Sequence, residues 1–390
     1  MKSALHALFA LFAVSTLAAT SEALAAEKVH GVEISPGGRH YAVLRDAGDQ
    51  RAFAIYAVDE TAAAPKGVGL GTIDIEDFEW GGDDYLLLRV AGEKGGLDTT
   101  AGLKTINFSR WMSIARETGK SQTLFGNERG SDFYYFIGAA GELLHALPLD
   151  NENALFARAS IEVKPGGPSR LKEGVDEQLY SLQRANLKTG KAVILREGTP
   201  DTIDWIVDEA GAVIARIDQA AQSKKIAIMA TDASGRNAKA AGEISGDAVE
   251  QERPAFFGAV KDARALQILK QQVGGFGGLA MYSYSLEAPG FGPAIDAPAP
   301  FQRAVYDPRF GRARIAYYAS AGGERAYHFE ADDQKAQASL EKALTGASVA
   351  IVSRSVDGAR MIARAAYADK GEEYYFFDKA AKRLELVATN

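Results

Sequence analysis

Apolar and polar residues alternate along most of this chain, and short turns interrupt the alternation at regular intervals. The stretch ISPGGRHYAVL, residues 34–44, shows the pattern, because a Ser-Pro-Gly-Gly turn is followed by residues that alternate in polarity. A period of two residues is typical of a β-strand with one buried face. The stretch therefore predicts a turn followed by a half-buried strand.

The same pattern returns six more times along the chain. The seven turns fall near Gly38, Asp83, Gly141, Gly211, Asp262, Gly311 and Gly358. Each copy is followed by a second hairpin, with the clearest turns at Thr118-Gly119-Lys120 and Thr189-Gly190-Lys191. The repeated unit is thus four strands, spaced mostly 45 to 58 residues apart, with a longer interval between the third and fourth turns.

Four-stranded units at this spacing are typical of a β-propeller, whose sheets bury their faces by stacking radially against their neighbours. We expect an all-β fold: a β-propeller of seven four-stranded blades over residues 27–390. Two separate β-sandwiches are the alternative, but they would not require the same order of turn, strand and hairpin seven times.

Two stretches depart from the repeat. Residues 164–178, KPGGPSRLKEGVDEQ, are rich in turn formers and charge, and they predict a loop that projects from one rim. Residues 332–344 place Ala336, Leu340 and Leu344 at helical spacing behind an acidic start. We therefore expect one short helix between the sixth and seventh blades.

The first residues have the form of a secretory signal. Lys2 precedes an apolar run over residues 7–19, and Ala23-Leu24-Ala25 is a small-residue cleavage site. Residues 1–25 are thus expected to be a signal peptide, and the mature chain to be periplasmic or secreted, without an integral membrane segment. A short buried helix or an uncleaved anchor is the alternative.

Composition narrows the classes of function. The chain has no cysteine, which excludes disulfides and thiolate metal sites. Its formal net charge of −7, without a cluster of Lys and Arg, argues against a nucleic-acid or anionic-membrane surface.

The sequence contains few candidate motifs for catalysis, nucleotide binding or metal binding. A nucleophile elbow needs G-x-S-x-G, and the nearest stretch, GASVA around Ser348, lacks the second Gly. The segment GFGGLA, residues 275–280, matches G-x-G-x-x-A but is followed by a strand pattern, so a blade turn is favoured over a nucleotide site. The four histidines outside the leader are expected on solvent-facing strand positions without metal-ligand spacing: His30, His40, His145 and His328.

The sequence also contains three pairs of adjacent acidic residues that we considered. Asp83-Asp84 is interpreted as a hairpin turn and Asp332-Asp333 as a helix start, and Glu373 of the third pair is expected to be a solvated neighbour of the aromatic run at residues 374–377. No catalytic, cofactor or metal residue is assigned.

Several stretches in this order resemble one known family. ISPGGRHYAVL, EWGGDDYLLL, YSLQRANLKTGKAVIL followed by WIVDEAGAVIAR, and the closing SRSVDGARMIARAAYADKGEEYYFFDKAAKRLELV look like the N-terminal propeller of prolyl-oligopeptidase-type serine peptidases of the S9 family. In that family the propeller caps an α/β-hydrolase domain and restricts access to short or unfolded peptides. The resemblance covers essentially all residues after the leader, whereas the hydrolase domain would begin where this sequence ends.

The resemblance implies a non-catalytic propeller that binds or filters peptides, or that docks a separately encoded α/β-hydrolase. Some family members hold a peptide's N-terminal ammonium with a Glu pair on the propeller, but none of the pairs above matches that feature. Two alternatives stay open. The chain could be the N-terminal portion of a split or truncated serine peptidase, or a periplasmic scaffold for protein–protein interaction.

Overall fold

The computed structural model describes residues 28–59, 64–99, 102–126, 140–161, 178–232, 234–244, 254–272, 278–321 and 323–390. Almost all regular structure in these ranges is antiparallel β-sheet, and one helix accompanies it. The expected all-β class is therefore confirmed. The proposed signal peptide, residues 1–25, and nearly all of the proposed rim loop at 164–178 lie outside the described residues.

Five sheets have four strands, each from one contiguous stretch of chain. Sheet A consists of β1 (Val29–Ile34), β2 (His40–Ala47), β3 (Gln50–Ala57) and β4 (Lys66–Gly71). Sheet B consists of β5 (Asp74–Gly81), β6 (Tyr85–Thr99), β7 (Gly102–Ala115) and β8 (Ser121–Thr123). Sheet C consists of β9 (Glu142–His145), β10 (Asn153–Ile161), β11 (Gln178–Asn186) and β12 (Ala192–Arg196). Sheet D consists of β13 (Thr202–Val207), β14 (Val213–Asp218), β15 (Ile226–Thr231) and β16 (Ala238–Ile244). Sheet F consists of β24 (Ala347–Arg354), β25 (Arg360–Tyr367), β26 (Gly371–Asp378) and β27 (Arg383–Thr389).

Sheet E has seven strands and joins two of the expected units. Its strands are β17 (Ala255–Ala259), β18 (Ala265–Gln271), β19 (Leu279–Ser285), β20 (Gly290–Ala294), β21 (Phe301–Asp307), β22 (Arg312–Ser320) and β23 (Gly323–His328). The two parts meet through single pairs, Leu279 with Phe301 and Gly258 with Arg312. Gly258 has a φ of +98°, and a Cβ atom there would lie 1.9 Å from the carbonyl oxygen of Gly311. Glycine thus permits this close backbone approach.

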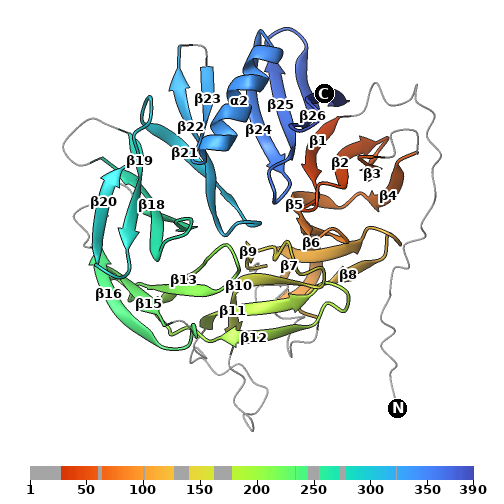
Figure 1. The fold of residues 1–390 in the computed structure, drawn as a ribbon. Coiled ribbons are helices and arrows are strands. Elements are labelled where there is room, and N and C mark those ends of the chain that lie inside the picture. Colours follow the sequence, from red (N-terminus) through yellow and green to blue (C-terminus); the bar gives the residue numbers. More distant parts are fainter. Residues whose placement is uncertain are drawn as a thin grey trace, which may run out of the picture.

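The sheets follow one another in chain order around a ring, and β1 lies against β24 and β25 (Figure 1). Alternating apolar residues on neighbouring sheets form the core between them. Phe53 of sheet A packs with Trp80 of sheet B, and Trp111 of sheet B packs with Phe156 of sheet C. This stacking is how each antiparallel sheet buries both faces.

The helix α2 (Ala331–Ala343) occupies the predicted place between β23 and β24. Ala336 and Leu340 are buried against sheet F, as the helical spacing indicated. Asp332 and Asp333 stand in the first turn, where carboxylates interact favourably with the helix dipole. The prediction of this helix is confirmed.

Two predictions about the repeat are wrong. Gly141 precedes β9, so the turn between the first two strands of the third unit lies later, around Asp150 and Asn151. The sequence GAAGELLH resembles the repeat because it also places glycines before an apolar stretch. The sixth unit, moreover, has three strands, because α2 follows β23 where a fourth strand was expected.

The turn between β21 and β22, residues 308–311, reaches the middle of the ring (Figure 1). We call these residues the central tip. The backbone N–H of Ala146, next to β9, donates to the Pro308 carbonyl at 2.8 Å, and that of Ala259 in β17 donates to the Gly311 carbonyl at 3.2 Å. The central tip therefore contacts two further segments, one next to β9 of sheet C and the other in β17 of sheet E.

Candidate functional site

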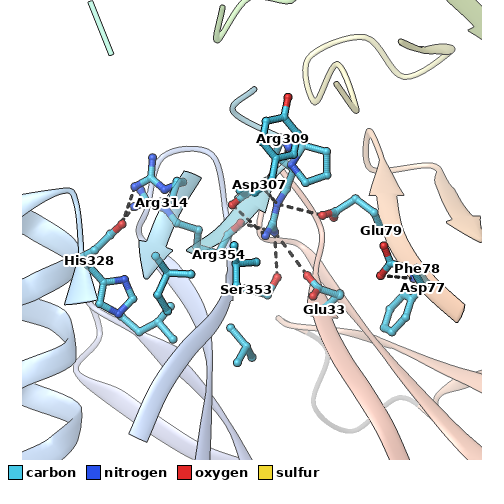
Figure 2. Close-up of a pocket in the computed structure, with 17 residues that line it drawn as sticks. Glu33, Asp77, Phe78, Glu79, Asp307, Arg309, Arg314, His328, Ser353 and Arg354 are labelled. Atoms are coloured by element: carbon cyan, nitrogen blue, oxygen red, sulfur yellow. Dashed lines mark hydrogen bonds and ion pairs between the residues drawn. The ribbon is translucent and has the colours of Figure 1, made fainter. Parts of the chain in front are cut away.

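A pocket of about 210 Å³ lies where the central tip meets β1, β5 and β24. Its wall brings together residues that are far apart in the sequence, including Glu33 of β1, Glu79 of β5, Arg309 of the central tip and Ser353 of β24 (Figure 2). About half of the lining residues carry charged side chains, and both signs are present. We take this pocket as the candidate functional site.

Arg309 contacts residues from several parts of the pocket wall. Its side chain is only 4% exposed, and its Nε donates to Asp307 Oδ1 at 3.1 Å. Its Nη1 donates to the hydroxyl of Ser353 and to the carbonyl of Arg354, at 2.9 Å each. Burial alone would lower the pKa of Arg309, but the surrounding carboxylates raise it above its ordinary value. Arg309 is therefore a fixed positive charge.

Glu33 and Glu79 face this guanidinium at 3.7 Å and 3.6 Å. Burial raises the pKa of Glu79 to about 7, against the attraction of Arg309. Burial, followed by the charge of Glu79, raises the pKa of Glu33 well above its ordinary value. Glu33 Oε2 is buried and has no hydrogen-bond partner among the described residues. This side of the pocket thus places three carboxyl groups around one cation, and Glu33 Oε2 faces that cation at 3.7 Å without a hydrogen bond.

The opposite wall carries Arg314 and Arg354, which both bind Asp333 of α2. Arg314 Nη2 donates to Asp333 Oδ2 at 2.5 Å. Burial would raise the pKa of Asp333, but Arg354 and Arg314 outweigh it and lower the pKa below its ordinary value. The Arg314 side chain is 8% exposed, and its Nε has no hydrogen-bond partner in the part of the chain that the structure describes. This wall has two cations for one carboxylate and an unused donor.

The site residues stand at matching places in the repeat. Glu33, Glu79 and Ser353 lie within the last three residues of the first strand of sheets A, B and F, and Asp307 is the last residue of β21. Sequence analysis missed all four residues. The available signal was this shared position: Glu33 and Glu79 each precede an apolar residue that leads into the repeated turn.

The structure places Ser348 and the histidines in structural contacts. The hydroxyl of Ser348, on β24, donates to the Glu324 carbonyl at 3.1 Å. His145 and His328 are buried, so their expected solvent exposure is wrong. The reason is that both contact neighbouring segments: His145 Nε2 lies 3.2 Å from the Glu209 carbonyl oxygen, and His328 Nε2 lies 3.2 Å from Gln337 Oε1. Burial lowers the pKa of both histidines, that of His145 to about 4.

His30 and His40 lie nearer the surface. His30 Nε2 is 2.7 Å from Asp46 Oδ1, and the His40 ring stacks on that of Trp80 with their centroids 6.5 Å apart. Among the described residues there is no cluster of His, Asp and Glu that could hold a metal ion. No helix in that part of the chain is long and apolar enough to span a membrane.

The carboxylate pairs lie in the elements that the sequence indicated, and they also form contacts that the sequence did not predict. Asp83 is in the β5–β6 turn and accepts from Gly37 N–H at 2.7 Å, which joins sheets A and B. Asp333 starts α2 and also closes the basic wall of the pocket. Glu373 is only 14% exposed and accepts from the Tyr375 hydroxyl at 2.6 Å, so its expected solvation is wrong. The segment at residues 275–280 lies mostly outside the described residues, and the predicted strand, β19, begins in it at Leu279.

Comparison with known proteins gives a likeness of fold. No family model matches the sequence, and no curated protein matches it. A structure from an analysis of two prolyl endopeptidases aligns with 93% of this chain and 50% of its own, with 11% identity and a TM-score of 0.54. Prolyl oligopeptidase B from Galerina marginata, bound to a 35mer substrate, aligns with 93% of this chain and 51% of its own, with 10% identity and a TM-score of 0.52.

The apo form of the Galerina marginata enzyme gives the same TM-score of 0.52. This chain spans about half the length of these structures. At 10 to 11% identity the likeness shows the fold alone. The resemblance that the sequence indicated is therefore confirmed at that level: the described sheets have a fold like that of one half of the prolyl oligopeptidases.

Proposed function

We propose that this chain is an exported seven-bladed β-propeller that carries out no catalysis itself, binds peptides, and works beside an α/β-hydrolase in a separate chain. The observation that carries the proposal is the alignment of 93% of the chain with half of a prolyl endopeptidase at a TM-score of 0.54. Those structures are peptidases, so peptides are the ligands that this likeness favours.

The seven-blade interpretation divides sheet E into two units. A single residue pair joins β19 to β21, whereas neighbouring strands within each part pair over several residues. Separation at that pair gives β17–β20 as a fifth blade and β21–β23 as a sixth, with α2 after it in place of a fourth strand. Sheet F is then the seventh blade.

The central tip limits where peptides could bind in such a propeller. It contacts segments of sheets C and E, and Arg309 anchors it through hydrogen bonds to Asp307, Ser353 and Arg354. A peptide threading through the centre would have to displace this buried, charged contact. We therefore propose that peptides bind at the pocket beside the tip and do not pass through the ring.

Affinity purification of the tagged chain, followed by labelling with a fluorophosphonate probe, tests the proposal. We expect a co-purified hydrolase to react at its serine and the propeller chain itself to stay unlabelled. Labelling of the chain at any serine would contradict the non-catalytic role. In parallel, fluorescence anisotropy with an acetylated, amidated decapeptide measures peptide binding, and the absence of binding would contradict that part.

A second candidate is that the chain is the N-terminal portion of a split serine peptidase. The coverage of only half of each aligned peptidase favours it. Reading the DNA that follows the coding sequence separates the two proposals, because a hydrolase frame with G-x-S-x-G directly downstream supports the split peptidase and an unrelated sequence does not.

A further inference from the structure

The outer strands of the sheets differ in how their free edges are protected. An edge strand presents unpaired N–H and C=O groups, and natural proteins usually place a charge or a proline there, or keep the strand very short. Five outer strands follow this rule: β8 has three residues, and the others contain Lys66 in β4, Lys239 in β16, Pro293 in β20 and Glu385 in β27.

The outer strand of sheet C, β12, lacks such protection. Its sequence is Ala-Val-Ile-Leu-Arg, and no described strand pairs with the edge that faces away from β11. The charge of Arg196 is turned toward sheet D, because its Nε donates to the Gly235 carbonyl at 2.6 Å and its Nη2 to the Ser234 carbonyl at 2.9 Å. Figure 1 shows β12 at the outer rim of the ring, where another chain could reach it.

The same strand exposes apolar side chains on both of its faces. Val193 is 53% exposed and Ile194 is 47% exposed, and they are the one pair of adjacent large apolar residues with this exposure among the described residues. Adjacent residues of a strand point to opposite faces of the sheet. A partner that covers both side chains must therefore approach along the edge, as an added strand does.

The sequence around β12 favours a second copy of this chain as that partner. Residues 189–199 read TGKAVILREGT, so their chemistry is similar in both directions from Ile194. In an antiparallel pair centred on Ile194, Val193 lies opposite Leu195 and Lys191 lies opposite Glu197. Lys191 and Glu197 are both exposed, and opposite charges placed across two strands stabilise the pairing.

We propose that two copies of the chain pair through their β12 strands, antiparallel and centred on Ile194, so that two sheets C form one continuous sheet. A two-fold axis through this point uses the same surface on both copies, so the assembly closes at a dimer. One strand edge buries less than the roughly 1,200 Å² of a stable interface, so we expect association in the micromolar range. This inference goes beyond the proposed function and does not depend on it.

Sedimentation velocity of the purified chain from about 1 to about 200 µM tests the proposal. We expect the sedimentation coefficient to rise with concentration from that of a monomer toward that of a dimer. Ile194→Lys places two like charges on the two-fold axis and should weaken dimerisation at least about tenfold. Leu386→Lys is the matched control, since Leu386 is 53% exposed on the outer strand β27, and it should dimerise as the unaltered chain does.

A charge exchange tests the register of the pairing. Lys191→Glu and Glu197→Lys should each weaken dimerisation, because each places like charges opposite one another, and the double variant should restore it. Both positions are exposed, and circular dichroism of each variant checks that it folds. A monomer at every concentration would overturn the proposal. An Ile194→Lys variant that dimerises normally, or a double variant that is weaker than both single variants, would also overturn it.

Discussion

At the scale of single residues, one buried cation organises the pocket. Arg309 brings together Asp307, Glu33 and Glu79, and it also binds the Ser353 hydroxyl. Removing charges from water is expensive, and their mutual attraction compensates only when the geometry also satisfies their hydrogen bonds. Arg309 meets this condition through its guanidinium fork, which a lysine ammonium could not reproduce.

Replacing Arg309 should therefore destabilise the protein strongly. We expect Arg309→Met to lower the free energy of unfolding by about 3–5 kcal/mol, because it leaves buried carboxylates without their cation. Arg303→Met is the control, since Arg303 forms an ion pair with Glu324 at the surface and should cost about 1 kcal/mol. Urea denaturation of both variants measures the difference, and similar losses would show that the Arg309 cluster has no special role.

Glu79 should make stability depend on pH in an unusual direction. Its pKa is raised from 4.5 to about 7 by burial, so between these values the folded chain holds a proton that the unfolded chain has released. Unfolding then releases a proton, and the free energy of unfolding falls as the pH rises from about 4.5 to about 7. A shift of this size corresponds to roughly 3 kcal/mol.

Thermal unfolding from pH 5 to pH 8 measures this contribution. Glu79→Gln cannot ionise, so its melting temperature should fall less with rising pH than that of the unaltered chain. Glu76→Gln lies on the same strand at a half-exposed position and is the matched control. A pH profile that is unchanged by Glu79→Gln would mean that Glu79 ionises normally in the folded protein.

At the scale of elements, α2 pairs with the free edge of sheet F. Gln337 Nε2 donates to the Val349 carbonyl at 2.6 Å, and Gln337 Oε1 accepts from the Ile351 N–H at 3.2 Å. One side-chain amide thus pairs with two backbone groups at the edge of β24, as a neighbouring strand would. Edge strands leave such groups exposed unless they are covered or paired.

The helix itself was predictable, but this pairing was not. Ala336 and Leu340 lie one helical turn apart, and that periodicity is readable because it depends only on local spacing. Gln337 lies between them and has no local pattern to mark it, because its partners on β24 are 12 to 14 residues away along the chain. The misplaced third turn has a similar cause, since local turn chemistry at Gly141 does not determine which strands pair.

Substitution of Gln337 tests the role of the helix. Gln337→Leu is of similar size but leaves the Val349 carbonyl and the Ile351 N–H without partners, so we expect a loss of about 2–4 kcal/mol in unfolding free energy. Ser339→Ala, on the exposed face of α2, should change it by less than about 0.5 kcal/mol. Hydrogen exchange at Ile351 supplies a local readout, and a protected amide in Gln337→Leu would contradict the proposed pairing.

At the scale of the whole molecule, side-chain contacts join the first and last sheets. Val29 N–H donates to Asn390 Oδ1 at 3.2 Å, and Asn390 Nδ2 donates to the Val29 carbonyl at 3.1 Å. Val32 and Ile34 pack with Phe376 in one buried cluster. Each of these two sheets is built from its own segment, so no strand is exchanged between them.

The order of the sheets was predictable because most copies of the repeat carry their own turn and strand pattern. The pocket was not, because its residues come from β1, β5, the central tip and β24, which meet only when the ring is formed. Glu33 and Arg309 are separated by more than 270 residues, and no spacing rule connects residues at that distance. The charge balance of the site is thus a property of the closed molecule.

We predict that the chain tolerates circular permutation, because the first and last sheets are each built from one contiguous segment and are joined by side-chain contacts. We expect a permutant that starts at Thr199, runs to Asn390, continues through a short Gly-Ser linker to Lys28 and ends at Gly198 to unfold in one cooperative transition. The new ends fall in the loop between β12 and β13, so every sheet stays intact, and the linker joins residues that are already in contact.

A permutant opened between Asp357 and Gly358 is the matched comparison. That turn separates β24 from β25, and its neighbour Val356 donates from its N–H to the Pro36 carbonyl at 2.8 Å, so opening it weakens both sheet F and the closure to sheet A. Circular dichroism during urea denaturation should show a lower midpoint for this permutant than for the one opened at Thr199. The reverse order would mean that the loop between β12 and β13 contributes more to stability than the contact between the first and last sheets, and that the ring is not closed in the way described above.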